Sequence, residues 1–506
     1  MYIVTAKEMY DIDRYTMQEI GIEGKLLMEN AGREVCKRLE TILEENKLIT
    51  ILVGAGNNGG DGFVIARTLL NQMHSVHVIQ VVPDGKITGD VLYHKNLYLN
   101  CGGSVNYVEQ AQDADELIKH ADFIIDAMVG IGVKGVLKEP VSTIVTMVNE
   151  GPAYVISVDI PSGLPADEGE SNFKSVQADY TIVIAAPKIS AFLQHTAPYY
   201  GKWEVVSIGL PLPVFQQYAD RHVITAEQFK KTMPKRNKYS HKGSHGNGLI
   251  VGGSPEMPGS LIMSVKAALK AGAGLITAGT YRKVISAVAS QCIEATYLSI
   301  PETNAFSGND HPIPTENYDA IALGMGMGRH DETRALVSDI MRQANCPLVI
   351  DADGLYHLKN ELTILQARTG APTIITPHPG EMAMLLNISV EALLEAPFQH
   401  ALAFAETHQV YVILKGTYTI ITAPDGKQAV STAGNPGLAK GGSGDVLTGI
   451  VLAMVMQDPS VFQALCNACF IHGTSADLLV EESHSYHDVM ASDVIEGISK
   501  VYRTFS

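Results

Sequence analysis

A glycine-rich segment ending in an aspartate is the part of this chain best suited to chemistry. It runs from Ala433 to Asp445, with five glycines and one lysine, Lys440, and an apolar segment of helical character follows at 446–454. Glycines let backbone N–H groups converge on an anion, and the following helix adds its positive end. A bound phosphate would repel Asp445, so we expect Asp445 to activate a hydroxyl that attacks a phosphoryl group. The alternative is a structural turn with Asp445 as helix cap, which needs neither five glycines nor the lysine.

Further polar residues follow apolar runs in the first two hundred residues. The stretch Asn57–Gly62 lies between an expected strand and an expected helix at 63–70, where phosphates often bind. Asn58, Asp126 and Ser162 follow different strands and can converge. Their oxygens, of mixed and low total charge, suit K⁺ better than zinc. The alternative is a set of turn-forming residues.

Asp159 ends another apolar run and precedes Pro161. That position places it at the edge of a site rather than in a solvated loop. A partly buried carboxylate there can serve as a general base or acid. It can equally cap the next turn, and the residues alone do not separate the two interpretations.

Alternating strands and helices must position these residues. Continuous apolar runs at 49–53, 76–82, 123–126, 154–159 and 180–185, separated by helical segments, predict a parallel sheet covered on both faces. The rhythm loosens near residue 215 and restarts at 223, so we expect domains at 1–215 and 222–506. In the second domain, strands are expected to end before Gly252, Gly324, Asp351, Thr376 and Lys415. The basic stretch 235–246 is a linker by composition, or it borders a site.

Composition sets further bounds on function. The chain has 506 residues, 46% hydrophobic and 18% charged, with a formal net charge of −17. That charge argues against general binding of nucleic acid or membrane surfaces. No signal peptide or spanning segment is visible, which predicts a cytoplasmic protein without membrane association. Cys466 and Cys469 form a CxxC with helical surroundings, so buried core residues are expected rather than a metal site.

The N-terminal motifs, Asn57–Gly62, the Asp126 segment and Val158–Gly163, resemble the NAD(P)H-hydrate epimerase family in this order over about residues 1–210. That family interconverts the R and S forms of hydrated NADH or NADPH. The resemblance implies a Rossmann-like three-layer parallel-sheet domain, with a K⁺ site at Asn58, Asp126 and Ser162. It implies catalysis at Asp159. It implies substrate binding at Asn57, Asn58, Gly59, Gly60, Asp61, Gly130, Ile131, Gly132, Val133, Lys134, Gly135, Val136 and Asp159.

The second half resembles the ADP-dependent NAD(P)H-hydrate dehydratase family, a branch of the ribokinase-like superfamily, over about residues 225–500. The matching stretches include Ser240–Gly243, Gly324–Gly328, Asp351–Asp353, Thr376–Met382 and Lys415–Thr417, besides the glycine-rich segment. Both halves in this order resemble the bifunctional NAD(P)H-hydrate repair enzymes of bacteria. The expected fold class is therefore α/β, a Rossmann-like domain followed by a ribokinase-like α/β domain.

This second resemblance implies Asp445 as the base, ADP as co-substrate with Mg²⁺, and a homo-oligomer of four or more chains. His378 alone would be an ordinary loop histidine, and its context favours a site. The implied hydrate-binding residues are Gly326, His378, Pro379, Gly380, Glu381, Met382 and Asp445. The implied ADP-binding residues are Lys415, Gly416, Thr417, Tyr418, Thr419, Gly434, Asn435, Gly441, Gly442, Ser443 and Gly444.

Two other functions fit part of the sequence. A ribokinase-type kinase for a vitamin or sugar alcohol explains the glycine-rich segment and Asp445, but not the first domain. A non-enzymatic scaffold for RNA-associated assembly would reuse the N-terminal fold, and the negative charge together with Asp126 and Asp159 speaks against it.

Overall fold

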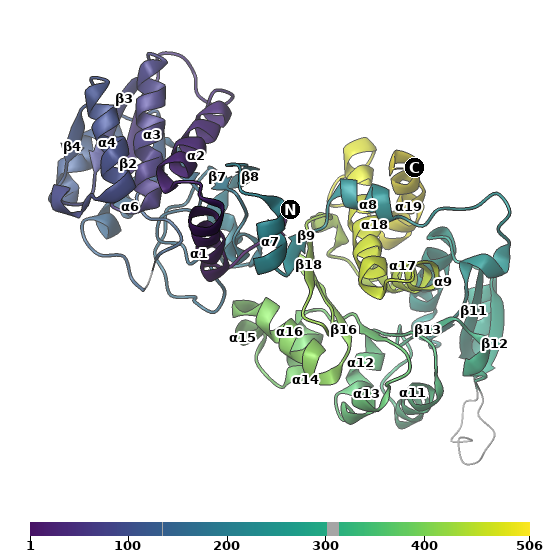
Figure 1. The fold of residues 1–506 in the computed structure, drawn as a ribbon. Helices are drawn as coiled ribbons and strands as arrows, with labels where there is room; N and C mark the ends of the chain where they lie inside the picture. The colour runs from purple at the N-terminus through teal and green to yellow at the C-terminus, as the bar shows by residue number, and fades with distance from the viewer. Residues whose placement is uncertain (134, 301–312, 506) are drawn as a thin grey trace. The chain divides into compact units, whose positions relative to one another are not determined.

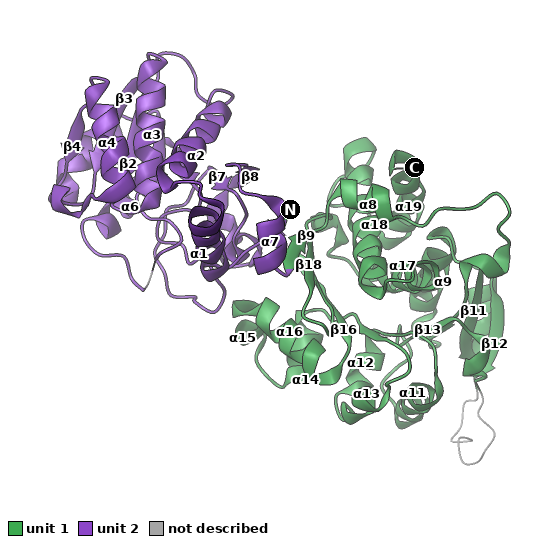
Figure 2. Cartoon of the chain, viewed as in Figure 1, with its two compact units in different colours: residues 1, 221–506 green, residues 2–220 purple. Residues whose placement is uncertain are grey.

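The computed structural model of the chain describes residues 1–133, 135–300 and 313–505. It divides into two compact units, one of residues 2–220 and one of residue 1 with residues 221–506 (Figure 2). We call them unit 2 and unit 1, and Figure 1 labels their elements. None of the described helices combines the length and apolar character needed to cross a bilayer.

Unit 2 is built on a parallel sheet. The strand order is β4-β3-β2-β5-β6-β7-β8, and every pair is parallel. The central strands are runs of apolar residues buried on both faces, as a covered parallel sheet requires. The strands are β2 (Leu48–Val53), β3 (Ser75–Gln80), β4 (Val105–Tyr107), β5 (Phe123–Ala127), β6 (Tyr154–Val158), β7 (Tyr180–Ile184) and β8 (Lys202–Val206).

Helices cover both faces of this sheet. One core cluster joins α2, α3 and α4 to one face, and a second joins α5 and α6 to the other. This is the expected three-layer α/β arrangement. The helices are α1 (Ala6–Tyr15), α2 (Gly24–Leu39), α3 (Asn57–Asn71), α4 (Gly89–Asn100), α5 (Asp115–Lys119), α6 (Val141–Glu150) and α7 (Leu212–Tyr218).

The sheet of unit 1 runs in the order β9-β18-β17-β16-β15-β14-β13-β10-β11-β12. The pairs from β16 to β12 are parallel, whereas β16, β17 and β18 form antiparallel pairs. The strands are β9 (Arg221–Val223), β10 (Asn247–Val251), β11 (Leu275–Tyr281), β12 (Thr296–Ile300), β13 (Ala320–Leu323), β14 (Leu348–Ile350), β15 (Thr373–Ile375), β16 (Tyr411–Leu414), β17 (Thr419–Thr422) and β18 (Gln428–Ser431).

Two groups of helices cover this sheet. Helices α9 (Pro258–Lys270), α17 (Ser443–Gln457), α18 (Val461–Glu482) and α19 (Ala491–Phe505) pack together over one face, and α11 to α16 lie on the other (Figure 1). The latter are α11 (Asp331–Gln343), α12 (Asp353–Leu358), α13 (Thr363–Ala367), α14 (Pro379–Leu386), α15 (Val390–Glu395) and α16 (Pro397–His408). Helices α8 (Ala226–Thr232) and α10 (Arg282–Ala289) complete the unit.

The ends of several strands agree with those predicted from the sequence. In unit 1, β10, β13, β14, β15 and β16 each stop within a residue of the expected end. Cys466 and Cys469 are buried free thiols on α18, so the expectation that this CxxC belongs to the core is confirmed.

Candidate functional site

The glycine-rich segment of unit 1 leads directly into α17. Gly442 has a φ of 93° and caps the helix, which begins at Ser443, three residues earlier than the apolar pattern indicates. A side chain at Gly442 would also bring its Cβ to 2.5 Å from the Met263 sulfur. Because Asp445 lies in the first helical turn, its carboxylate stands where the helix end favours negative charge.

Asp445 is half-buried at this position. Burial and the nearby charge of Asp351 raise the pKa of Asp445 to about 6, against the opposing effects of Ser260 and Lys415. Its backbone carbonyl accepts a hydrogen bond from Ser264 of α9 at 2.9 Å. A carboxylate whose pKa lies near neutrality is suited to general base catalysis.

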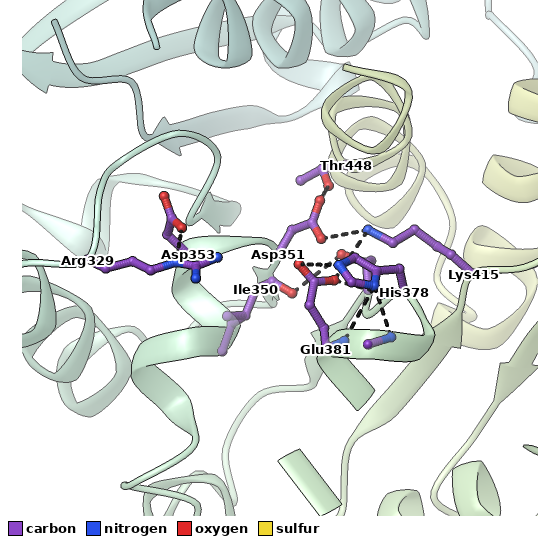
Figure 3. Close-up of polar contacts among 10 residues, drawn as sticks. Arg329, Ile350, Asp351, Asp353, His378, Glu381, Lys415 and Thr448 are labelled. Carbon is purple, nitrogen blue, oxygen red and sulfur yellow. Dashed lines mark hydrogen bonds and ion pairs between the residues drawn. The ribbon is translucent and has the colours of Figure 1, made fainter. Parts of the chain in front are cut away.

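Lys415 and Asp351 form an ion pair next to this turn (Figure 3). Lys415 Nζ lies 2.9 Å from Asp351 Oδ1, and the Thr448 hydroxyl donates to Asp351 Oδ2 at 2.7 Å. Burial lowers the pKa of Lys415, but Asp351 and Glu381 outweigh it, so the pKa is raised and the ammonium is kept. A Cβ on Gly444 would lie 3.3 Å from Lys415 Nζ, which places this cation beside the start of α17.

The histidine motif begins α14. His378 Nδ1 accepts the Gly380 N–H at 3.0 Å, and Glu381 accepts the His378 N–H at 2.9 Å, which makes a capping box (Figure 3). Glu381 Oε2 lies 4.0 Å from Lys415 Nζ, so the motif and the Lys415 segment meet. Pro379 and Gly380 belong to the first helical turn, and the side chain of Met382 is fully buried.

A third loop reaches the same edge of the sheet after β13. Asp353 accepts the Gly328 N–H at 2.9 Å and Arg329 Nε at 2.8 Å, which fixes the loop that carries Gly326. Gly326 has a φ of 59°, and a Cβ there would lie 2.9 Å from the Ser260 Cβ. Gly326 therefore lies close to Ser260, which in turn contacts Asp445.

Other residues predicted to bind ADP spread around this centre. Gly416 and Thr417 are exposed in the turn between β16 and β17, with Tyr418 and Thr419 behind them, and Gly441 is exposed before α17. The Gly434 N–H and the Asn435 amide donate to Asp477 at 2.8 and 2.9 Å, so these donors are used within the protein. Lys440 donates to the carbonyls of His487 and Val489, which makes it an anchor of the loop.

In unit 2 the stretch Asn57–Gly62 forms the first turns of α3, whereas the sequence predicts a loop before a helix at 63–70. Close packing explains the difference. A Cβ on Gly59 would lie 2.1 Å from the Gly54 oxygen, and one on Gly62 would lie 2.7 Å from a Val53 methyl. The glycines let the helix start against the end of β2.

Asn58, Asp126 and Ser162 gather around the segment that follows β5. Asp126 is fully buried and accepts from the hydroxyls of Ser157 and Ser162 and from two backbone N–H groups. Burial raises its pKa, against these hydrogen bonds. The Ser162 hydroxyl also accepts the Val129 N–H at 2.8 Å, and a Cβ on the adjacent Gly130 would lie 3.3 Å from the Asn58 Cβ.

The Asn58 carboxamide is buried, and neither its oxygen nor its nitrogen has a hydrogen-bond partner within the part of the chain that the structure describes. An unpartnered amide oxygen beside a buried carboxylate and a hydroxyl is an oxygen-donor set that fits an alkali cation. Among those residues, no three His, Cys, Asp or Glu side chains form a metal cluster.

Asn58 borders a cavity of 790 Å³, whose lining includes neither Asp126 nor Ser162. Of the predicted substrate-binding residues, its lining includes Asn57, Asn58, Asp61, Gly130, Ile131, Gly132 and Asp159. Gly59 and Gly60 are buried in α3. Gly135 and Val136 are exposed in the loop after β5, in which Val133 is half-buried. Lys134 lies outside the described residues.

Tyr10, Asp13 and Lys188 are among the lining residues that sequence reasoning missed. The buried Lys188 ammonium forms an ion pair with Asp159 Oδ1, which also accepts the Ile184 N–H at 3.0 Å. Asp159 has a φ of 67° and follows β6 directly. Lys188 lies four residues after the end of β7, and this position after a strand was the sequence feature that could have identified it as a site residue.

Comparison with known proteins places both units in families. The profile of the family described as NAD(P)H-hydrate dehydratase matches residues 248–500, and that described as YjeF-related protein N-terminus matches residues 24–190. The chain is 36% identical to the bifunctional NAD(P)H-hydrate repair enzyme Nnr of Moorella thermoacetica, over 99% of this chain and 97% of that protein.

Solved structures agree for unit 1. The ADP/ATP-dependent NAD(P)H-hydrate dehydratase of Bacillus subtilis, co-crystallised with ATP/Mg²⁺, is 32% identical, with a TM-score of 0.50 over 56% of this chain and 98% of that one. A ribokinase-like superfamily protein from Enterococcus faecalis is 22% identical, with a TM-score of 0.50 over 57% of this chain and 97% of that one, and shows the fold alone. The predicted family and fold class are confirmed, and the chain belongs to the bifunctional NAD(P)H-hydrate repair enzymes.

Proposed function

We infer that this protein repairs hydrated NADH and NADPH in two steps. Unit 2 interconverts the R and S hydrates, and unit 1 dehydrates the S form at the expense of ADP. The full-length likeness to bifunctional repair enzymes supports both activities over a ribokinase-type kinase. The observation that carries the dehydratase is Asp445, a half-buried carboxylate at the start of α17 beside Lys415.

The dehydratase reaction uses phosphate to replace a poor leaving group. Asp445 removes the proton of the hydrate hydroxyl, whose oxygen forms a bond to the terminal phosphorus of ADP while AMP leaves. The original bond between the ring carbon and this oxygen then breaks, phosphate leaves with the electron pair, and loss of a neighbouring ring proton restores the double bond. Backbone N–H groups of Gly441, Gly442, Ser443 and Gly444 stabilise charge that develops on the phosphoryl group.

We propose that the nucleotide is bound by Lys415–Thr419, Gly434, Asn435 and Gly441–Gly444, and the hydrate by Gly326 and His378–Met382. Co-crystallisation of the Bacillus relative with ATP/Mg²⁺ supports Mg²⁺ as companion of the nucleotide. The nearby carboxylates Asp351 and Glu381 are already engaged by Lys415. The Mg²⁺ ion would therefore be held chiefly by the phosphate oxygens of the nucleotide. When bound, it neutralises phosphate charge.

For the epimerase we propose that Asn58, Asp126 and Ser162 hold K⁺, and that Asn57–Asp61, Gly130–Val136 and Asp159 bind the hydrate. The unpartnered Asn58 amide supports the cation site. When bound, K⁺ would supply positive charge for the substrate phosphates. Titration with K⁺ against Na⁺, read as thermal stability and as R-to-S conversion, tests this site.

The proposal also includes a cytoplasmic location and a homo-oligomer of four or more chains. Many enzymes of the cytoplasm use reduced nicotinamide cofactors, so an activity that repairs these cofactors is needed in that compartment. Cell fractionation tests the location, and light scattering coupled to size-exclusion chromatography tests the assembly.

One absorbance experiment tests the main proposal. Incubation of S-hydrate with the protein, ADP and Mg²⁺ should restore the 340 nm absorbance of NAD(P)H, and R-hydrate should follow at the rate of epimerisation. The control omits nucleotide. No recovery with ADP or ATP would reject the dehydratase, and a stable phosphorylated product would favour the kinase.

A further inference from the structure

The cavity of unit 2 contains more carboxylates than its cations can neutralise. Among the described residues, four carboxylates, Asp13, Asp61, Asp90 and Asp159, line it, together with the cations Arg14 and Lys188. Arg14 forms an ion pair with Asp11 at 2.6 Å, and Lys188 forms one with Asp159. Within the described part of the chain, neither Asp13 nor Asp61 forms an ion pair or a side-chain hydrogen bond.

Lys188 already has two partners for its ammonium, Asp159 and the Ile184 carbonyl. Its side chain is 1% exposed, and its ammonium also donates to the Ile184 carbonyl at 3.4 Å. The Asp159 oxygen that it contacts accepts the Ile184 N–H as well. Asp159 is therefore tied to Lys188 and the backbone, whereas Asp13 and Asp61 have no such partner among the described residues of the cavity.

Asp13 and Asp61 differ as proton donors. Burial, with the charge of Asp159, raises the pKa of Asp13 to about 6 against the effect of Lys188. Burial and the charges of Asp159 and Asp13 raise the pKa of Asp61 well above its usual range, against the effect of Lys188, so Asp61 gives up a proton less readily than Asp13. The titratable and charged groups that line the cavity with Asp13 are Tyr10 and Arg14 on α1, Asp61 on α3, Asp90 on α4, and Asp159 and Lys188 at the sheet edge.

We propose that Asp13, which lines the cavity without an ion-pair partner among the described residues, supplies and recovers the proton in the interconversion of R and S hydrates, while Lys188 pairs with Asp159 in the same cavity. The inference rests on the proposed epimerase function of unit 2 and adds a residue that no sequence motif marks.

The reaction balances without a co-reactant. Water adds to a dihydronicotinamide at the carbon bonded to the ring nitrogen, because that carbon carries positive charge once the double bond is protonated. Asp13 gives its proton to the hydroxyl of this carbon, the C–O bond breaks, water leaves, and the nitrogen lone pair forms a C=N bond. Water adds to the other face and returns a proton to Asp13. The Asp159 carboxylate stabilises the cation between these steps.

The test compares Asp13→Asn with wild type and with Asp11→Asn, a matched substitution two residues away on α1. Chiral chromatography measures R-to-S conversion, with the enzyme-free rate subtracted, and 340 nm absorbance measures dehydration of S-hydrate by the same samples. Asp13→Asn should lower kcat for epimerisation about 100-fold or more with KM little changed. Dehydration should be unaffected, and Asp11→Asn should epimerise like wild type.

The pH profile separates a proton donor from a structural residue. In wild type, epimerisation should fall about tenfold per pH unit above pH about 6, where Asp13 loses its proton. This limb should vanish in Asp13→Asn and return in Asp13→Glu.

An Asp13→Asn enzyme within threefold of wild type, or one that keeps the alkaline limb, overturns the inference. If wild type does not interconvert the hydrates, the proposed function of unit 2 fails and the inference falls with it. If wild type does so and Asp13→Asn is equally active, only the inference fails.

Discussion

Each unit places aspartates beside a lysine at the carboxyl edge of parallel strands, but the lysine has a different partner in each. In unit 2, Lys188 pairs with Asp159, the aspartate to which the sequence motif points. In unit 1, Lys415 pairs with Asp351, and Asp445 forms no ion pair with a described residue. In unit 2 the lysine therefore forms an ion pair with the aspartate of the sequence motif, Asp159. In unit 1 it does not, and the motif aspartate Asp445 has no ion-pair partner among the described residues.

The difference shows that the carboxyl able to exchange a proton is the one with which the lysine does not form an ion pair. A buried carboxyl without a counter-ion has a raised pKa, whereas an ion pair favours the charged form. Asp445 in unit 1 and Asp13 in unit 2 are the uncompensated carboxyls with a pKa of about 6. The following predictions test this comparison, from the largest expected effect to the smallest.

Replacement of Asp445 by Asn should abolish most dehydratase activity and leave epimerisation intact. Loss of a general base typically costs about 10²–10⁴-fold. The measurement is kcat for recovery of 340 nm absorbance from S-hydrate with ADP. Asp458→Asn, just beyond the other end of α17, is the matched control and should keep the wild-type rate. A decrease of less than tenfold in Asp445→Asn would exclude Asp445 as the base.

Replacement of Asp351 by Asn should destabilise unit 1. The change leaves the Lys415 ammonium without its nearest carboxylate, and removal of one member of a buried pair costs about 3–5 kcal/mol of unfolding free energy. Urea unfolding measures the loss. The double variant Asp351→Asn with Lys415→Met should recover much of it, and a single-variant loss under about 1 kcal/mol would show that the pair is not structural.

The two activities should respond to pH in opposite directions. Asp445 must be deprotonated to act, so kcat/KM for dehydration should fall about tenfold per pH unit below pH about 6. Epimerisation should instead fall above that pH, because Asp13 must be protonated. Parallel profiles for the two reactions in one preparation would contradict the comparison.

Replacement of Lys440 by Met should have a small effect. Its ammonium donates to two carbonyls of the segment 487–489, so the loss should be about 1–2 kcal/mol of stability. The KM for ADP should rise a few-fold because the loop is less fixed, while kcat stays near wild type. A decrease in kcat comparable with that of Asp445→Asn would assign Lys440 to the chemistry instead.

The strands and their ends could be predicted from sequence because continuous apolar runs end in Gly, Asp or Thr-Pro. This pattern gives the edge of the sheet on which Asp351, Glu381, Lys415 and Asp445 meet. The pairing among them could not be predicted. Whether Lys415 contacts Asp351 or Asp445 depends on side-chain positions that are set by the packing of α17 on β13 and α9.

Two features of unit 2 lay beyond sequence reasoning. Asn57–Gly62 is rich in glycine, a poor helix former, and it is helical because tertiary packing outweighs propensity. Asp13 lies on an amphipathic helix with no motif around it, and only the folded chain brings it to Asp159, which is 146 positions away. Lys188 had only its place after a strand to mark it.

The crowded glycines of α3 bear on how such a chain can diverge. Gly59 and Gly62 lie so close to backbone and to short, rigid side chains that no larger residue fits. Gly60 differs, because an added Cβ would clash only with the flexible end of the Met28 side chain. Substitution at Gly59 or Gly62 should therefore prevent folding before any effect on ligand binding matters. A variant library at positions 59 and 62 selected only for folding would be expected to return the same two glycines. The glycines of the sequence motif that identifies this domain are then required in part by the close packing of α3 against the end of β2.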